Sequence, residues 1–212
     1  MSEKEFAPYN IITSDSEGYY EEKKSRFLAY VHPASSEEEA VSFIALIKKK
    51  HYDARHNCYA MIIGPKKEFR KASDDGEPQR TAGMPMLDVL EGSGLTNVVA
   101  VVTRYFGGTL LGTGGLVRSY QSALKDALNK ADIRQVIYCA DVTVRIPYTL
   151  QGELSYYFEN SGIVVMSTEY AEDVIYNIRL KAEESQNVLS KIVDITKGKA
   201  VIGDPVLGYN PI

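Results

Sequence analysis

The sequence predicts an α+β protein with two domains, and three observations support this fold class. First, strand-like runs and helical patterns alternate along 212 residues that are 44% hydrophobic and 25% charged, which is typical of globular domains. Second, the apolar run "NVVAVVTRYF" leads through a glycine-rich turn into a helical repeat. Third, the strand and helix pattern begins again after "NKADI". We therefore expect one domain over residues 1–133 and another over residues 134–212.

In the first part, short strands are expected around Tyr19 and from Phe27 to Val31. The segment "SSEEEAVSFIALIKKKHY" predicts a helix in which Ser36 and Glu39 form a capping box. A strand at "NCYAMIIG" is followed by a long polar loop, "GPKKEFRKASDDGEPQRTAG", and a short helix at "MPMLDVLEG". The strand "NVVAVVTRYF" then precedes an amphipathic helix from about Gly115 to about Lys130.

The second part predicts the element order βαββαβ. The strand "QVIYCADVTVRI" is followed by a helix that Pro147 opens, and then by the strands "IVVMSTEY" and "VIYNIRLKA". A further helix ends at Gly198, a good left-handed cap, and "KAVIGDPVLGY" forms the closing strand. This order is that of the ferredoxin-like motif.

Composition excludes several functional classes. The net charge of −4 argues against a protein that binds nucleic acid over its whole surface, and no apolar run approaches the length of a membrane span. The polar start, "MSEKEFAPYN", does not resemble a signal peptide. Cys58 and Cys139 form neither a disulfide framework nor a zinc motif. We expect a cytoplasmic protein without a metal or another cofactor and leave its oligomeric state open.

The segment "RYFGGTLLGTGGLVRSY" is the first candidate site. Thr113 stands where a P-loop needs lysine, and Val117 occupies the third glycine position of a dinucleotide fingerprint, so both motifs fail. Backbone N–H groups entering a helix could still hold an anion, with help from Arg104 and Arg118. Alternatively, the glycines only supply positive φ angles and close packing. The glycines concerned are Gly107, Gly108, Gly112, Gly114 and Gly115.

Two polar groups form an accessory candidate site. Asp74, Asp75 and Glu77 lie within four residues and could supply acid–base chemistry or bind a divalent ion, but they also suit turns on a solvated loop. We favour the turn interpretation and expect no tight metal site. His56, at the start of a strand, is a candidate general base, or it hydrogen-bonds the neighbouring loop.

Two long segments, "SDDGEPQRTAGMPML" and "VVTRYFGGTLLGTGGLVRSY", resemble the IMPACT family, and in particular its bacterial two-domain YigZ-type members. The segment "YDARHNCYA" is similar to the same family around His56. Leu110 and Met84 differ from the family pattern, because basic residues are common at these positions. The matching positions are Asp74, Asp75, Gly76, Glu77, Pro78, Thr81, Ala82, Gly83, Arg104, Phe106, Gly107, Gly108, Gly112, Gly114, Gly115 and Arg118.

The resemblance implies a first domain like the second domain of ribosomal protein S5, a sheet with two helices on one face. It implies a second, ferredoxin-like domain that resembles the last domain of elongation factor G. Eukaryotic IMPACT proteins are tied to translational control, where they compete for a ribosome-associated activator of an initiation-factor kinase through an additional N-terminal domain. The resemblance assigns no settled reaction to the bacterial members.

Two functional hypotheses follow from these observations. In the first, the protein is a non-catalytic cytosolic binding protein of the translation apparatus, and it contacts RNA, the ribosome or a ribosome-bound protein through the glycine segment. In the second, it is an enzyme that holds a phosphorylated substrate on the glycine segment and uses the acidic residues 74–77. We prefer the first hypothesis. A single pocket lined by both segments would favour the enzyme, and their separation on a convex face would favour binding.

Overall fold

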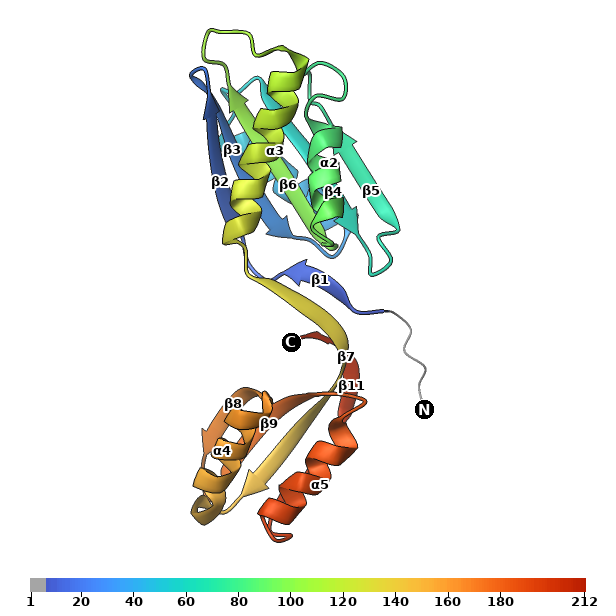
Figure 1. Ribbon diagram of the computed structural model, residues 1–212, viewed down its shortest axis with the longest axis vertical. Helices are drawn as coiled ribbons and strands as arrows, with labels where there is room; N and C mark the ends of the chain where they lie inside the picture. Colours follow the sequence, from blue (N-terminus) through green and yellow to red (C-terminus); the bar gives the residue numbers. More distant parts are fainter. Residues whose placement is uncertain (1–6) are drawn as a thin grey trace. The chain divides into compact units, whose positions relative to one another are not determined.

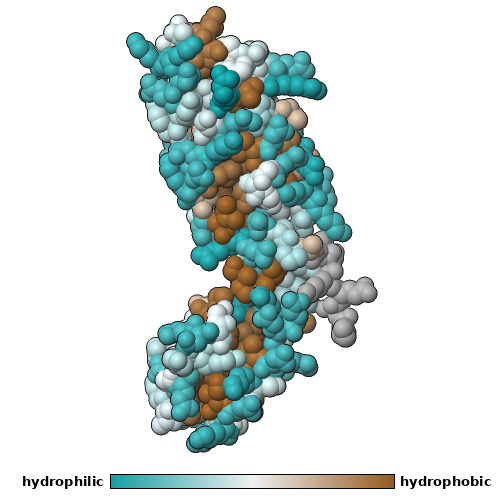
Figure 2. All heavy atoms as spheres, viewed as in Figure 1, coloured by the Kyte–Doolittle hydropathy of each residue, from teal (hydrophilic) through white to brown (hydrophobic). Residues whose placement is uncertain are grey.

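The computed structural model describes residues 7–212, which divide into two compact units. The first unit comprises residues 9–135, and the second comprises residues 136–212 together with residues 7 and 8. Each unit contains a sheet with helices packed against it (Figure 1). Each also has its own hydrophobic core. Hydrophilic side chains cover most of the visible surface, with smaller hydrophobic areas between them (Figure 2). None of the helices within residues 7–212 combines the length and the apolar character that crossing a membrane requires.

The first unit is built on a five-stranded antiparallel sheet with the order β2-β3-β6-β4-β5. The central strand β6 is the predicted apolar run, and it is buried along almost its whole length because both of its faces are covered. The strands are β2 (Ser16–Glu22), β3 (Ser25–Pro33), β4 (His56–Ile63), β5 (Phe69–Ser73) and β6 (Val98–Tyr105).

Helices cover both faces of this sheet. Helices α2 (Gly83–Gly92) and α3 (Gly112–Lys130) pack on one face, as Figure 1 shows, where they meet Val98 and Val102 of β6. Helix α1 (Glu37–Lys50) packs on the opposite face against Val99 of the same strand. The two-fold alternation of side chains along β6 therefore serves two cores. The resemblance implied a sheet with two helices on one face. Helix α1 is a further helix, on the other face of that sheet.

The predicted capping of α1 is present, with one difference. The Ser36 side chain accepts the Glu39 backbone N–H, as a capping box requires. The Glu39 carboxylate, however, accepts the backbone N–H of Ser35, at 2.7 Å, one residue before the expected position. This bond and the Ser35 hydroxyl lower the pKa of Glu39.

The sequence interpretation was wrong at three places in the first unit. Strand β5 lies within the expected polar loop, because an edge strand that pairs only with β4 exposes Arg70 and Lys71 and needs no apolar pattern. Strand β1 (Tyr9–Ile12) was not predicted. Helix α3 begins at Gly112 and not near Gly115, so its first turn consists largely of glycine, which gives no periodic signal.

The second unit confirms the predicted βαββαβ order. Within this unit the strand order is β7-β9-β8, and β10 and β11, into which the closing strand is divided, pair with the edge of β7 that faces away from β9. Helices α4 and α5 cover one face through Leu154, Phe158 and Ile192. The elements are β7 (Ile133–Ile146), a 3-10 turn (Tyr148–Leu150), α4 (Gln151–Ser161), β8 (Val164–Tyr170), β9 (Val174–Lys181), α5 (Ser185–Ile195), β10 (Val201–Ile202) and β11 (Val206–Pro211).

Gly198 has the left-handed conformation predicted for it, although α5 ends earlier, at Ile195, with Thr196 as its C-cap. Gly198 has φ +75°, and its N–H donates to the Val193 carbonyl. Lys197 shares the left-handed conformation, with φ +52°. The turn after α5 therefore uses two such residues in succession and satisfies the last carbonyl groups of the helix.

Candidate functional site

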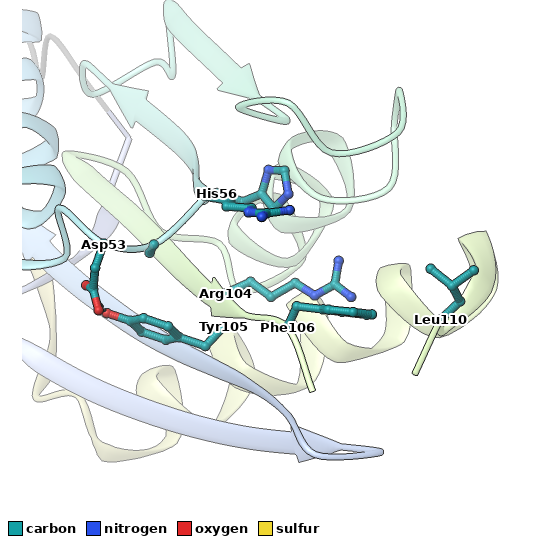
Figure 3. Close-up of a pocket in the computed structure, with 8 residues that line it drawn as sticks. Asp53, His56, Arg104, Tyr105, Phe106 and Leu110 are labelled. Atoms are coloured by element: carbon teal, nitrogen blue, oxygen red, sulfur yellow. Dashed lines mark hydrogen bonds between the residues drawn. The ribbon is translucent and has the colours of Figure 1, made fainter. Parts of the chain in front are cut away.

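A pocket of about 510 Å³ opens at one end of the first sheet, where β4 begins and β6 ends (Figure 3). The antiparallel register pairs His56 with Arg104, and this brings together two segments that lie far apart in the sequence. The lining residues are Asp53, Ala54, Arg55, His56, Arg104, Tyr105, Phe106 and Leu110. The pocket therefore combines basic side chains with an apolar wall.

The apolar wall consists of side chains that are unusually exposed for their type. Phe106 is 56% exposed and Leu110 is 84% exposed. The Arg104 guanidinium carbon lies 5.5 Å from the centre of the Phe106 ring and 5.6 Å from that of the buried Phe27. These cation–π contacts hold Phe106 at the pocket while much of its ring stays open to solvent (Figure 3).

Arg104 itself belongs to a buried ion pair. Its Nη1 lies 2.7 Å from Glu77 Oε1, and the two side chains are only 8% and 3% exposed. The Tyr120 hydroxyl donates to the same Glu77 oxygen at 2.9 Å, while Arg104 Nε is buried without a hydrogen-bond partner. Arg104 is thus not the free cation beside the glycine segment that the sequence suggested, because its charge is compensated inside the unit.

Asp74 caps helix α2 from a distance. Ala82, the N-cap residue of this helix, offers no side-chain hydrogen bond. Asp74 Oδ1 instead accepts the N–H groups of Ala82 and Gly83, and its Oδ2 accepts that of Arg80. Burial raises the pKa of Asp74, but these backbone donors outweigh burial and leave the pKa below its usual value.

Asp75 connects the same loop to α1 and β4. Its carboxylate lies 2.7 Å from Lys48 Nζ and accepts the Asn57 N–H at 2.8 Å. Its carbonyl lies 3.0 Å from His56 Nδ1. Because a carbonyl only accepts, Nδ1 of His56 carries a proton, and Nε2 is the acceptor of the neutral ring.

The acidic loop does form a turn, in which the Glu77 N–H donates to the Asp74 carbonyl at 2.9 Å, but its carboxylates also support the scaffold. Each of Asp74, Asp75 and Glu77 is engaged by backbone or side-chain donors of the first unit. Within residues 7–212, no three His, Cys, Asp or Glu side chains are grouped so that they could hold a metal ion.

A directed chain of hydrogen bonds supports the other side of the pocket. The Tyr105 hydroxyl donates to Asp53 Oδ1 at 2.8 Å, so it accepts from His51 Nδ1 at 2.9 Å. His51 Nε2 then accepts the Tyr30 hydroxyl at 2.8 Å. Burial, with the nearby Lys50 charge, lowers the pKa of His51 and so favours this neutral form. This chain was not predicted, because its four members come from three separate segments of the sequence.

The backbone geometry explains why three of the five positions are glycine. A Cβ on Gly107 would lie 2.1 Å from the Lys24 carbonyl carbon, and its N–H donates to Ser25 Oγ at 3.0 Å. Gly108 and Gly112 have φ angles of +88° and +71°. Gly107 thus allows the backbone to approach the turn between β2 and β3 closely, and Gly108 and Gly112 allow the backbone to change direction.

The other two glycines lie in the first turn of α3, where φ is not positive. This helix has no side-chain cap, because Leu111 is its N-cap residue, and its first N–H groups lack intrahelical partners. A Cβ on Gly114 would lie 3.4 Å from Arg118 Nη1, so the exposed Arg118 side chain extends over this turn. The pocket is not lined by Gly114, Gly115 or Arg118. Between Phe106 and these residues, Leu110 lines it.

The structure thus places His56 and Arg104 in one pocket, with Asp74, Asp75 and Glu77 behind it as support. Sequence reasoning did not find Asp53 and Tyr105 as pocket residues. Their hydrogen bond forms only when the start of β4 meets the end of β6.

Comparison with known proteins gives the family. The Impact N-terminal domain family matches residues 23–128, and the family described as a domain of unknown function (DUF1949) matches residues 144–199. The IMPACT family member YvyE of Bacillus subtilis is 37% identical over 187 residues, which are 88% of this chain and 86% of that protein. The IMPACT family member YigZ of Escherichia coli is 33% identical over 178 residues, 83% of this chain and 87% of that protein.

More distant similarity and a solved structure agree with this result. Protein IMPACT of Mus musculus is 36% identical over 96 residues, which cover 43% of this chain and 30% of the mouse protein. A crystal structure described as that of a hypothetical protein superposes with a TM-score of 0.60 at 31% identity, over 92% of this chain and 96% of that chain. The chain therefore belongs to the IMPACT family.

Proposed function

We propose that this protein is a non-catalytic cytosolic binding protein linked to translation, and that its first unit contacts single-stranded RNA of the ribosome or of a ribosome-bound complex. The link to translation rests on its family, whose eukaryotic members are tied to translational control. In line with the resemblance, we assign the first unit to the fold of the second domain of ribosomal protein S5. We assign the second unit to the ferredoxin-like fold of the last domain of elongation factor G.

The observation that carries the proposal is the composition of the pocket. An exposed aromatic ring, Phe106, stands beside the exposed Arg55 and the partly exposed His56. Unstacked bases bind to protein by stacking on such rings, and exposed cations follow the phosphates. The Arg104–Glu77 pair fixes the ring in place without adding net charge.

The N-terminus of α3 supplies a second, electrostatic contact. Its N–H groups carry the positive end of the helix dipole, and Arg118 extends over them. Because Leu110 of the pocket leads directly into this helix, one extended strand of RNA can place a base on Phe106 and a neighbouring phosphate at Arg118.

The enzyme hypothesis has less support from the same geometry. It needs Asp74, Asp75 or Glu77 as an acid, a base or a metal ligand, and all three are used to hold the loop, α2 and Arg104 in place. His56 lines the pocket, but no carboxylate of this loop lines the pocket with it.

Fluorescence anisotropy with a short labelled oligouridylate at low and high salt tests the proposal. Phe106→Ala should remove about 1–3 kcal/mol of binding free energy, the contribution of one stacked base. Arg118→Ala should weaken binding and lower the salt slope by about one. Lys125→Ala removes the same charge further along α3 and serves as the matched control. Unchanged binding in both the Phe106 and the Arg118 variants would refute this site.

A further inference from the structure

Strand β8 forms an open edge of the sheet in the second unit. It pairs with β9 on one side, and no strand within residues 7–212 pairs with its other side. Its outer N–H and C=O groups are therefore available to another extended chain. This surface is separate from the pocket of the first unit and does not depend on the function proposed for that pocket.

Much of this edge is apolar, and it lacks two of the usual protections of an edge strand. Val164, Val165, Met166 and Tyr170 are 36%, 38%, 42% and 62% exposed. Natural edge strands commonly carry lysine or proline to prevent pairing, and β8 has neither. A shift in register between Val165 and Ser167 bends the strand, which disfavours unlimited stacking of identical edges.

The charge around this edge selects the type of partner. Residues 147–173, which form the 3-10 turn, α4 and β8, contain no Lys, Arg or His. Nucleic acid is repelled by such a segment, and a second copy of the chain would bring a second set of like charges to the same edge. The acidic residues of the segment are Glu153, Glu159, Glu169, Glu172 and Asp173.

The register of β8 predicts how the side chains of a partner would alternate. Val165 and Tyr170 lie opposite Ile178 and Val174, which belong to the helix-covered core. Glu169 points to the other face of the sheet, because successive residues of a strand alternate. An added strand would thus extend the core with apolar residues on one face and meet Glu169 with basic residues on the other.

We infer that the β8 edge binds an extended segment of a partner protein in which apolar and basic residues alternate, and that this segment adds one strand to the sheet. Backbone hydrogen bonds along β8 supply affinity that is independent of sequence, and the two faces supply the preference for this alternation.

The test uses the full chain and a capped peptide of about ten residues that alternates valine and lysine. Anisotropy measures binding, and hydrogen exchange with mass spectrometry locates protected amides. We expect slower exchange across residues 164–170 and weaker or absent binding of the matched valine–glutamate peptide. N-methylation of alternate amides in the valine–lysine peptide should abolish binding, because strand addition needs these donors.

Protein variants separate the charge from the edge. Glu169→Lys together with Glu172→Lys should weaken the valine–lysine peptide about fivefold to tenfold, since exposed ion pairs contribute modestly. Asp194→Lys on α5 makes the same kind of change outside the segment and should leave affinity unaltered. Three results would overturn the inference: protection that falls outside β8, equal affinity for the glutamate peptide, or a dimer in which β8 is already protected without peptide.

Discussion

Replacing Glu77 with Gln should destabilise the first unit by about 3 kcal/mol or more, because the Arg104 guanidinium would remain buried without a counter-charge. The two side chains are 3% and 8% exposed and their charged atoms lie 2.7 Å apart, so water cannot replace the lost partner. Glutamine keeps the size of the side chain and can still accept the Tyr120 hydroxyl. The loss therefore reports the charge and not a cavity.

Urea unfolding followed by far-UV circular dichroism measures this loss, since the chain has no tryptophan. Glu37→Gln is the matched control, because Glu37 pairs with Lys71 at 3.0 Å on the surface and should contribute less than about 1 kcal/mol. Adding Arg104→Met to Glu77→Gln should restore much of the stability, because both buried charges are then removed. If Glu77→Gln costs no more than Glu37→Gln, the acidic loop does not depend on this pair, and its carboxylate is free for chemistry.

Three further outcomes are expected. Gly107→Ala should destabilise the protein by about 2–3 kcal/mol because its Cβ meets the Lys24 backbone, whereas Gly114→Ala should be neutral or stabilising by up to about 1 kcal/mol; thermal unfolding compares the two. The pKa of Asp74 is lower in the folded protein than in the unfolded chain, so its carboxylate stabilises the fold at pH values above the unfolded pKa. This contribution is lost as the pH falls below about 4, and Asp74→Asn should therefore flatten the acid limb of the curve of stability against pH. Residues 134–212 expressed alone should unfold cooperatively, and a fragment without a denaturation transition would contradict two independent domains.

The helices and the central strand were predictable because their signals are local. The caps of α1, the four-residue repeat in α3 and the continuous apolar run of β6 each lie within one stretch of chain. The order of elements in the second unit followed from the same signals. Edge strand β5 was missed, because an exposed edge with charged side chains needs no pattern that distinguishes it from a loop.

The pocket was only partly predictable, since tertiary pairing creates it. His56 and Arg104 were candidates, but their proximity follows from the register between β4 and β6. Arg104 was expected to be a free cation, and nothing local indicates that Glu77 would be buried against it. A sequence can therefore identify polar residues that are candidates for a site. It does not show whether their charges face solvent or pair with each other inside the fold.

The glycine segment and the acidic loop act together as a support for the pocket. Gly107 brings the end of β6 against the turn between β2 and β3, while Glu77 holds Arg104 and, through it, the Phe106 ring. Asp75 fixes His56 from the other side. The segments that look most like catalytic motifs thus fix the backbone and the buried charges, and the groups left to meet a ligand are their exposed neighbours. Because Phe106 is 56% exposed among these neighbours, binding is tested best at Phe106.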